Sequence, residues 1–227
     1  MRHLLLRLRR DQSGVALLEF AFALPIALTL ALGGAELANY VITKMRISQI
    51  ALHLADNSAR IGSGSQLQAK TIDELDINDL ITGADLQSGE LKLLTNGRVI
   101  ISSIEPDPTY SGKSMIRWQR CSGAKTGFSS TIGSAGTNNK DAFGPTNRQV
   151  GALSDGVTMF VEVRYQYKPL IQTSLSPSTE MTEIASMMVR DRRDTSSDKK
   201  LANGNNNPNP THPDGVYNKT SAPIAGC

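Results

Sequence analysis

The first sixty residues contain the most strongly patterned part of the chain. Residues 15–35 read VALLEFAFALPIALTLALGGA and include one charged side chain, that of Glu19. A helix over residues 15–40 would be about 39 Å long at 1.5 Å per residue, which exceeds the ~30 Å hydrocarbon core of a bilayer. Pro25 lies inside this stretch, and membrane helices tolerate a proline. The pattern therefore predicts a transmembrane helix near the N-terminus.

The helical pattern continues beyond this apolar stretch, but it becomes two-sided. Apolar and small side chains recur three and four residues apart, and polar side chains occupy the opposite face. The first set is Ile47, Ile50, Ala51, Leu54, Ala55 and Ser58, and the second is Gln49, His53, Asp56 and Arg60. Gly62 and Gly64 then supply a stop signal. We therefore expect one helix over residues 15–61, which begins as a membrane helix and continues as an amphipathic helix.

Shorter patterns over residues 62–198 predict an exported α+β domain. One or two short helices are expected in residues 70–86. The predicted strands cover residues 97–104, 114–121, 156–169 and 183–189, and the first two form an antiparallel hairpin. We therefore predict an α+β fold in which a long N-terminal helix precedes a small antiparallel sheet, with a pilin-like outline.

The strand at residues 156–169 has the clearest alternation. Val161, Val163, Tyr165 and Tyr167 share one face, and Glu162, Arg164, Gln166 and Lys168 share the other. Residues 122–151 are rich in Gly, Ser, Thr and Asn and are expected to form a long loop. The Asn- and Pro-rich residues 199–227 are expected to be a flexible tail that builds no core.

The distribution of charge predicts the orientation of the membrane helix. The net charge of +3 is too small to indicate nucleic-acid binding. Four arginines precede the apolar stretch: Arg2, Arg7, Arg9 and Arg10. Because positive charge keeps the adjoining end of a membrane helix in the cytoplasm, we expect residues 1–14 to be a basic cytoplasmic leader. The chain is then a single-pass protein of the bacterial inner membrane with a periplasmic C-terminal domain.

A cleaved signal peptide is the alternative interpretation of the same N-terminus. Small residues at Gly33, Gly34 and Ala35 would suit the cleavage site, and the product would be a periplasmic or secreted binding or adhesive protein. Against this interpretation, a carboxylate such as Glu19 is unusual in the apolar core of a signal peptide. The helical pattern also continues through the supposed cleavage point.

Glu19 is the residue that most needs an explanation. A carboxylate at the centre of a membrane helix costs about 2.5 to 3.5 kcal/mol, and less near an interface. Glu19 either reaches the headgroups or has a functional partner. Cleavage after Gly14 would create an amine at Val15, and the Glu19 carboxylate of one subunit could neutralise the amine of its neighbour in a bundle of such helices.

The residues around Glu19 resemble a known family signature. Residues 14–20, GVALLEF, resemble the processing site of Flp-type pilins, in which a glycine is followed by four residues, a glutamate and an aromatic residue. The longer stretch over residues 9–61 resembles the TadE-like family of pilus assembly proteins. The matching landmarks are Arg10, Gly14, Glu19 with Phe20, Leu24 with Pro25, and the GAEL string that contains Glu36.

This resemblance implies a minor pilin or pseudopilin of the tight-adherence (Tad) machinery, which assists biogenesis of the Flp pilus. It implies a prepilin peptidase that cuts between Gly14 and Val15. It also implies that Glu19 and Phe20 take part in assembly with other Tad/Flp pilus subunits through the N-terminal helix.

The sequence contains few other candidate functional groups. The exported location permits a disulfide between Cys121 and Cys227, which we expect, although two unpaired thiols are the alternative. The three histidines show no metal-ligand spacing, and neither a nucleophile elbow nor a phosphate-binding loop is present. We expect no enzymatic activity, no cofactor and no metal. Residues 190–193, which include three arginines, are expected to be a solvated strand end, with contact to an acidic partner as the alternative.

Overall fold

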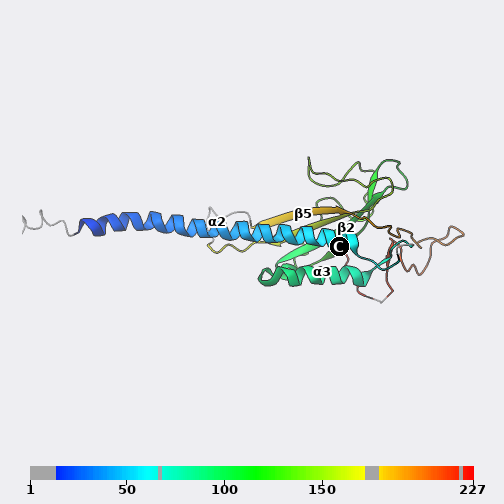
Figure 1. Ribbon diagram of the computed structural model, residues 1–227, viewed down its shortest axis with the longest axis horizontal. Helices are drawn as coiled ribbons and strands as arrows, with labels where there is room; N and C mark the ends of the chain where they lie inside the picture. Colours follow the sequence, from blue (N-terminus) through cyan, green and yellow to red (C-terminus); the bar gives the residue numbers. More distant parts are fainter. Residues whose placement is uncertain (1–13, 66–67, 172–178, 220–221) are drawn as a thin grey trace, which may run out of the picture. The chain divides into compact units, whose positions relative to one another are not determined.

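The computed structural model describes residues 14–65, 68–171, 179–219 and 222–227. It has the α+β fold that the sequence predicts, because a long apolar N-terminal helix precedes a four-stranded antiparallel sheet. Figure 1 shows the longest helix, α2, and the positions of α3, β2 and β5. The elements in order are α2 (Val15–Arg60), β1 (Ile72–Asp73), α3 (Glu74–Ser88), η1 (Gly89–Leu91), α4 (Leu93–Asn96), β2 (Gly97–Pro106), β3 (Ser114–Ser122), β4 (Thr158–Gln166), β5 (Glu180–Met188) and β6 (Val216–Tyr217).

The chain forms two compact units. The first unit contains the chain up to Ile42 and the segment that begins at Lys168. The second contains Thr43–Tyr167 and Thr179–Cys227. The arginine leader at residues 1–13 lies outside the described residues.

The helical part of the first unit is long, apolar and exposed. α2 has 46 residues and is long and apolar enough to span a membrane, and none of its most apolar stretch is buried. Leu17, Phe22 and Leu30 are each at least 70% exposed. Pro25 lies inside this helix, and its carbonyl accepts a hydrogen bond from the Thr29 hydroxyl at 2.7 Å. The Thr29 side chain thereby bonds to a carbonyl within the helix, as polar side chains in membrane helices commonly do.

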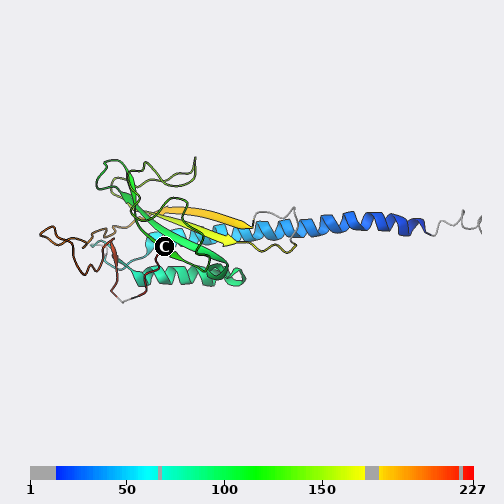
Figure 2. The ribbon, with the colours of Figure 1, turned by 180° about the vertical axis from the view of Figure 1, so that it is seen from behind.

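The second unit is built on the sheet, whose strand order is β3-β2-β4-β5 with every neighbouring pair antiparallel. All four strands overlap the stretches predicted from alternation, and β2 and β3 form the predicted hairpin. A register shift at Ser103 and Ile104 interrupts that hairpin. Figure 2 shows the sheet from behind, with α3 lying alongside the C-terminal part of α2.

One face of the sheet packs against the helices. The apolar face of α2 expected from the 3-and-4 spacing is buried, with Ile47 and Ala55 fully inaccessible. Val161 and Val163 of β4 are also fully buried. α3 is fixed to β3 by an ion pair between Glu74, which is 2% exposed, and Arg120. A capping box starts α3, because the carboxylate of Asp73 accepts a hydrogen bond from the N–H three residues later.

The other face of the sheet is covered by the long loop, which buries Glu162 on the polar face of β4. Glu162 is fully buried, and its carboxylate accepts hydrogen bonds from the Thr131 N–H at 2.8 Å and the Thr131 hydroxyl at 2.5 Å. Phe160 and Phe143 share an apolar cluster on this face with Ile132 of the loop. The loop therefore supplies both apolar cover and hydrogen-bond donors, which a buried carboxylate requires.

The expectation that residues 190–193 form a solvated strand end is wrong for Arg193. Its guanidinium donates to the carbonyls of Ser58 and Ile61 at 3.2 and 3.0 Å. These carbonyls belong to the last turn of α2 and the residue after it, where carbonyls have no partner inside the helix. The cation thus caps the end of α2, while Arg190 and Arg192 are exposed.

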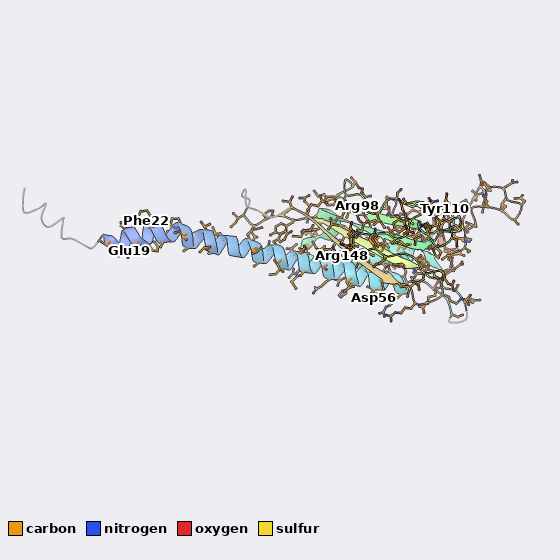
Figure 3. All side chains as sticks on the ribbon, turned by 90° about the horizontal axis from the view of Figure 1, so that it is seen from above. Glu19, Phe22, Asp56, Arg98, Tyr110 and Arg148 are labelled. Carbon is orange, nitrogen blue, oxygen red and sulfur yellow. A yellow bond between two sulfur atoms is a disulfide. The ribbon has the colours of Figure 1, made fainter. Side chains whose placement is uncertain are left out.

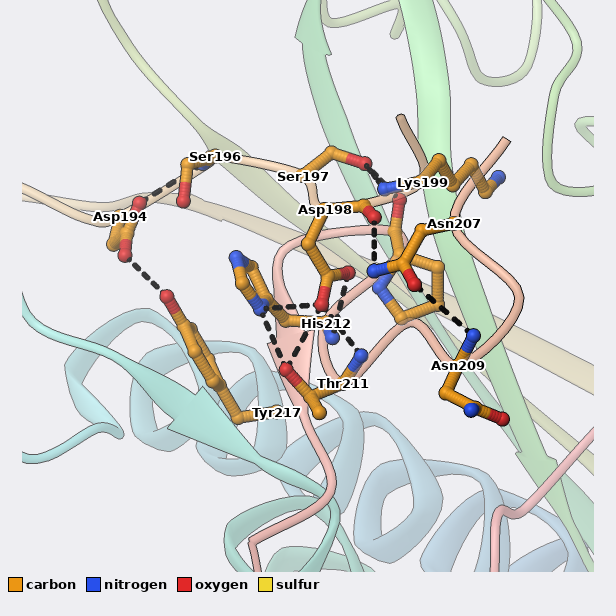
Figure 4. A network of polar contacts seen from close by, with 11 residues as sticks. Asp194, Ser196, Ser197, Asp198, Lys199, Asn207, Asn209, Thr211, His212 and Tyr217 are labelled. Carbon is orange, nitrogen blue, oxygen red and sulfur yellow. Dashed lines mark hydrogen bonds and ion pairs between the residues drawn. The ribbon is translucent and has the colours of Figure 1, made fainter. Parts of the chain in front are cut away.

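The C-terminal tail is held at several points, so the prediction that residues 199–227 build no core is also wrong. β6 pairs in parallel with β1, and Val216 is only 2% exposed. Figure 4 shows the His212 ring stacked on Tyr217 and the Asp198 carboxylate accepting the His212 N–H. Low apolar content predicted a free tail, but one apolar residue and hydrogen bonds between side chains and backbone hold this segment.

Candidate functional site

The predicted processing site lies at the start of α2. Gly14 precedes the helix, and its carbonyl accepts the first helical hydrogen bond, from the Leu18 N–H at 3.1 Å. A Cβ atom added at Gly14 would have no neighbour within 4 Å. Val15 begins the helix and is 49% exposed. Nothing in the described part of the chain therefore requires a glycine at position 14, and the peptide bond to Val15 is accessible.

Glu19 lies one turn into the helix, with its side chain exposed beside other exposed side chains (Figure 3). No hydrogen bond or ion pair connects Glu19 to any residue that the structure describes. Phe20 is 60% exposed and has no core to pack against. Because residues four apart share a face of a helix, Val15 and Glu19 lie on the same side of α2. The structure thus brings Val15, Glu19 and Phe20 together within the first two turns of α2.

A second carboxylate of α2 has a different environment. Glu36 is 7% exposed, and one of its oxygens accepts the N–H groups of Leu170 and Ile171 at 2.7 and 3.2 Å. Glu36 therefore has a structural role in the first unit, since it holds the segment that follows Lys168. Of the two glutamates in the helix, Glu19 is the one whose charge the described residues leave uncompensated.

The two cysteines lie in the second unit. Cys121 of β3 and Cys227 form a disulfide with an S–S distance of 2.01 Å. The Cys121 N–H also donates to the Ala225 carbonyl at 2.7 Å, and the Asn78 side chain of α3 donates to Pro223 at 2.9 Å. The last residues of the chain are therefore attached to both β3 and α3.

The sequence analysis missed a cleft in the second unit. It has a volume of about 730 Å³ and is lined by the ends of β2 and β3, by the residues before β4 and by residues 189–193 after β5. Its charged residues include Glu105, Arg117 and Arg192. These side chains come from different strands and connecting segments, and only the pairing of β2 with β3 and of β4 with β5 brings them together. The sequence analysis noted Arg192 within residues 190–193, but no local pattern connected it with Glu105 or Arg117.

Catalytic or metal-binding groups are not prominent. Among residues 14–65, 68–171, 179–219 and 222–227, no three His, Cys, Asp or Glu side chains lie close enough to hold a metal ion. Trp118, Tyr165 and Tyr167 are at most 5% exposed and serve as core residues of the sheet.

Comparison with known proteins adds no family assignment. No family model, no curated protein and no solved structure matches this chain.

Proposed function

We propose that this chain is a membrane-anchored minor pilin or pseudopilin that assists biogenesis of an Flp-type pilus of the tight-adherence machinery. The observation that carries the proposal is the uncompensated carboxylate of Glu19 on an exposed, apolar helix that begins at Val15. The resemblance of GVALLEF to the processing site of Flp-type pilins supports the same function. The expected partners are other pilus subunits, through the N-terminal helix, and a prepilin peptidase of the inner membrane.

The charge of Glu19 is costly to place in a membrane. An ionised carboxylate in lipid is expensive, so it is retained where it has a partner. After cleavage at Gly14, the amine of Val15 would be such a partner. In a bundle of parallel helices, the carboxylate of one subunit meets the amine of a neighbour, and each charge lowers the desolvation cost of the other. The chain itself offers Glu19 no partner among its described residues, which leaves the carboxylate available to another subunit.

In this proposal, the arginine leader stays in the cytoplasm, α2 crosses the inner membrane, and the sheet domain lies in the periplasm. The disulfide between Cys121 and Cys227 fits that compartment, because the periplasm allows disulfides to persist. A reporter that fluoresces only in the cytoplasm should be dark when fused after Cys227. A bright fusion would reverse the orientation.

The second candidate is a secreted binding or adhesive protein whose signal peptide is cut near Ala35. Gly33, Gly34 and Ala35 are exposed on α2, as a cleavage site requires. However, α2 runs without interruption from Val15 to Arg60, so this cut would fall inside a continuous helix.

The test is Glu19→Gln, which keeps the shape of the side chain and removes its charge. Neutral Gln costs less to place in lipid, so membrane insertion should be unchanged or slightly better. The lost pairing with a neighbour's amine is worth about 1 to 3 kcal/mol. Piliation and co-purification with other pilus components should therefore fall at matched membrane levels.

Two further variants make the test specific. Glu90→Gln is the same chemical change on an exposed residue of the other unit, and it should assemble normally. Gly14→Leu should leave a longer precursor, and it has room for its side chain because a Cβ there has no neighbour within 4 Å. Normal piliation with Glu19→Gln would mean that the carboxylate only reaches the headgroups, and the proposed mechanism would lose its central residue.

A further inference from the structure

The cleft in the second unit has more charged groups than its own ion pairs use. Its lining includes four arginines, which are Arg117, Arg190, Arg192 and Arg193, and four acidic residues, which are Glu105, Asp107, Asp155 and Asp191. The formal charges of these arginines and acidic residues sum to zero. Their hydrogen bonds show which of the charges remain available to a ligand.

Two of the acidic groups are fully engaged within the protein. The Asp107 carboxylate accepts the backbone N–H groups of Thr109 and Asn139, both at 2.8 Å, and thereby shapes the turn after β2. Asp191 forms an ion pair with Lys70 at 2.6 Å. Neither carboxylate forms an ion pair with Arg117, Arg190 or Arg192, although Asp191 interacts electrostatically with Arg193.

Glu105 contributes less negative charge than its formal value. It is 8% exposed, and burial raises its pKa to about 7, although a hydrogen bond from the Ser103 hydroxyl and the nearby Arg117 and Arg193 lower it. At neutral pH, this carboxyl group therefore carries a proton for much of the time. Asp155, the fourth acidic residue of the lining, makes no hydrogen bond or ion pair with another described residue.

The arginines are left with unused donors. Arg193 is committed to the carbonyls at the end of α2. The side chains of Arg117, Arg190 and Arg192 make no hydrogen bond or ion pair with any described residue. The Nε of Arg117 is buried and has no acceptor, which is a costly state for a charged donor. The cleft thus presents cationic donors that need acceptors.

We propose that this cleft binds an acidic peptide segment of a partner protein, whose carboxylates pair with Arg117, Arg190 and Arg192. Planar guanidinium groups suit carboxylates because two parallel N–H···O bonds can form with one group. The three arginines come from β3 and from the segment after β5, and a chain with several carboxylates can reach both. This proposal does not depend on the pilin function.

The experiment uses the full chain in a non-ionic detergent and a fluorescein-labelled hexaglutamate peptide, with hexaglutamine as the uncharged probe. Fluorescence anisotropy at pH 7 should show binding of hexaglutamate and none of hexaglutamine. The affinity should fall as salt is added, because the contacts are ionic. Arg117→Gln should weaken binding about tenfold, the effect of losing one charge-assisted hydrogen bond.

Matched variants test whether peptide binding depends on the arginines of the cleft or only on the net charge of the protein. Arg190→Gln and Arg192→Gln change exposed residues of the cleft, and each should weaken binding by several-fold even if Arg117→Gln fails to fold. Arg148→Gln removes the same charge from the exposed loop residue labelled in Figure 3, which does not line the cleft, and it should bind as the unchanged protein does.

Three results would overturn the proposal. The first is the absence of binding to hexaglutamate at low salt. The second is an equal loss of affinity in Arg148→Gln, which would assign binding to net charge. The third is binding of phosphatidylglycerol vesicles or inorganic phosphate, with the same dependence on the cleft arginines, in place of the peptide. That last outcome would make the cleft a phosphate site and not a peptide site.

Discussion

The buried carboxyl group of Glu105 predicts how the stability of the second unit depends on pH. Glu105→Gln keeps the size of the side chain and removes its ionisation. In the folded protein, burial raises the pKa of Glu105 from 4.5 to about 7, against the lowering effect of the Ser103 hydroxyl and the neighbouring arginines. At 1.36 kcal/mol for each pKa unit, the difference corresponds to about 3 kcal/mol.

The sign follows from proton binding. Between pH 4.5 and about 7, the unfolded chain releases the Glu105 proton and the folded chain retains it. The folded state therefore binds more protons, and the free energy of unfolding falls as pH rises through this window. Below the window, the glutamate protein and Glu105→Gln should be similar in stability. At pH 8, Glu105→Gln should be more stable by about 3 kcal/mol or somewhat less, because the cleft is open to solvent.

The assay is denaturant unfolding of the full chain in detergent micelles at pH 4.5, 6 and 8, followed by the fluorescence of Trp118. The quantity to compare is the difference in free energy of unfolding between Glu105→Gln and the unchanged protein, since other titrations cancel in that difference. Glu90→Gln, on an exposed side chain, should remain within about 0.5 kcal/mol at every pH. A difference for Glu105→Gln that does not grow with pH would refute the reasoning.

Two other predictions concern the domain. Cys227→Ser should abolish the change in electrophoretic mobility that reduction produces in the unchanged protein. It should also lower the free energy of unfolding by up to about 4.7 kcal/mol, because the disulfide closes a loop across 106 residues. Labelling of both cysteines by an alkylating reagent in the native protein would contradict the pairing. Gly97→Ala should destabilise the sheet by more than about 2 kcal/mol in thermal or denaturant unfolding, because its Cβ would lie 2.3 Å from the Arg164 carbonyl. Gly83→Ala, inside α3 with no neighbour within 4 Å, should instead stabilise the domain by about 0.5 to 1 kcal/mol. Equal effects of the two changes would count against the close approach of β2 and β4.

Local periodicity was sufficient to predict α2 and the four strands of the main sheet, but not the short elements β1, η1, α4 and β6. The 3-and-4 spacing that marks Ile47 and Leu54 gave the buried face of α2, and the stop at Gly62 is required by the structure. This glycine has a φ of +113°, and a Cβ there would lie 2.8 Å from the Thr71 carbonyl. The alternation in residues 156–169 gave β4 and its buried apolar face. In each case, the pattern of residues close together in the sequence is sufficient for the prediction.

The features that local patterns did not predict depend on contacts between segments that are distant in the sequence. Glu162 is buried because a loop about thirty residues earlier supplies donors to it. Arg193 caps a helix that ends more than a hundred residues before it. The cleft that contains Glu105 and Arg117 forms only when the strands pair. Alternation placed Glu162 on the polar face of β4, and Arg193 was expected to be solvated, but tertiary hydrogen bonds replace water at both side chains.

The mass of the native N-terminus distinguishes a processed pilin-like helix from a discarded signal peptide. The protein should be purified from the membrane of its own cells without reduction, and its first residue should be determined by mass spectrometry. The account predicts a chain that begins at Val15, with Glu19 as its fifth residue and α2 intact. A chain that begins at Ala35 or Glu36 would contradict it, because the segment with Glu19 would then be a discarded signal peptide and the protein would have no anchor from α2.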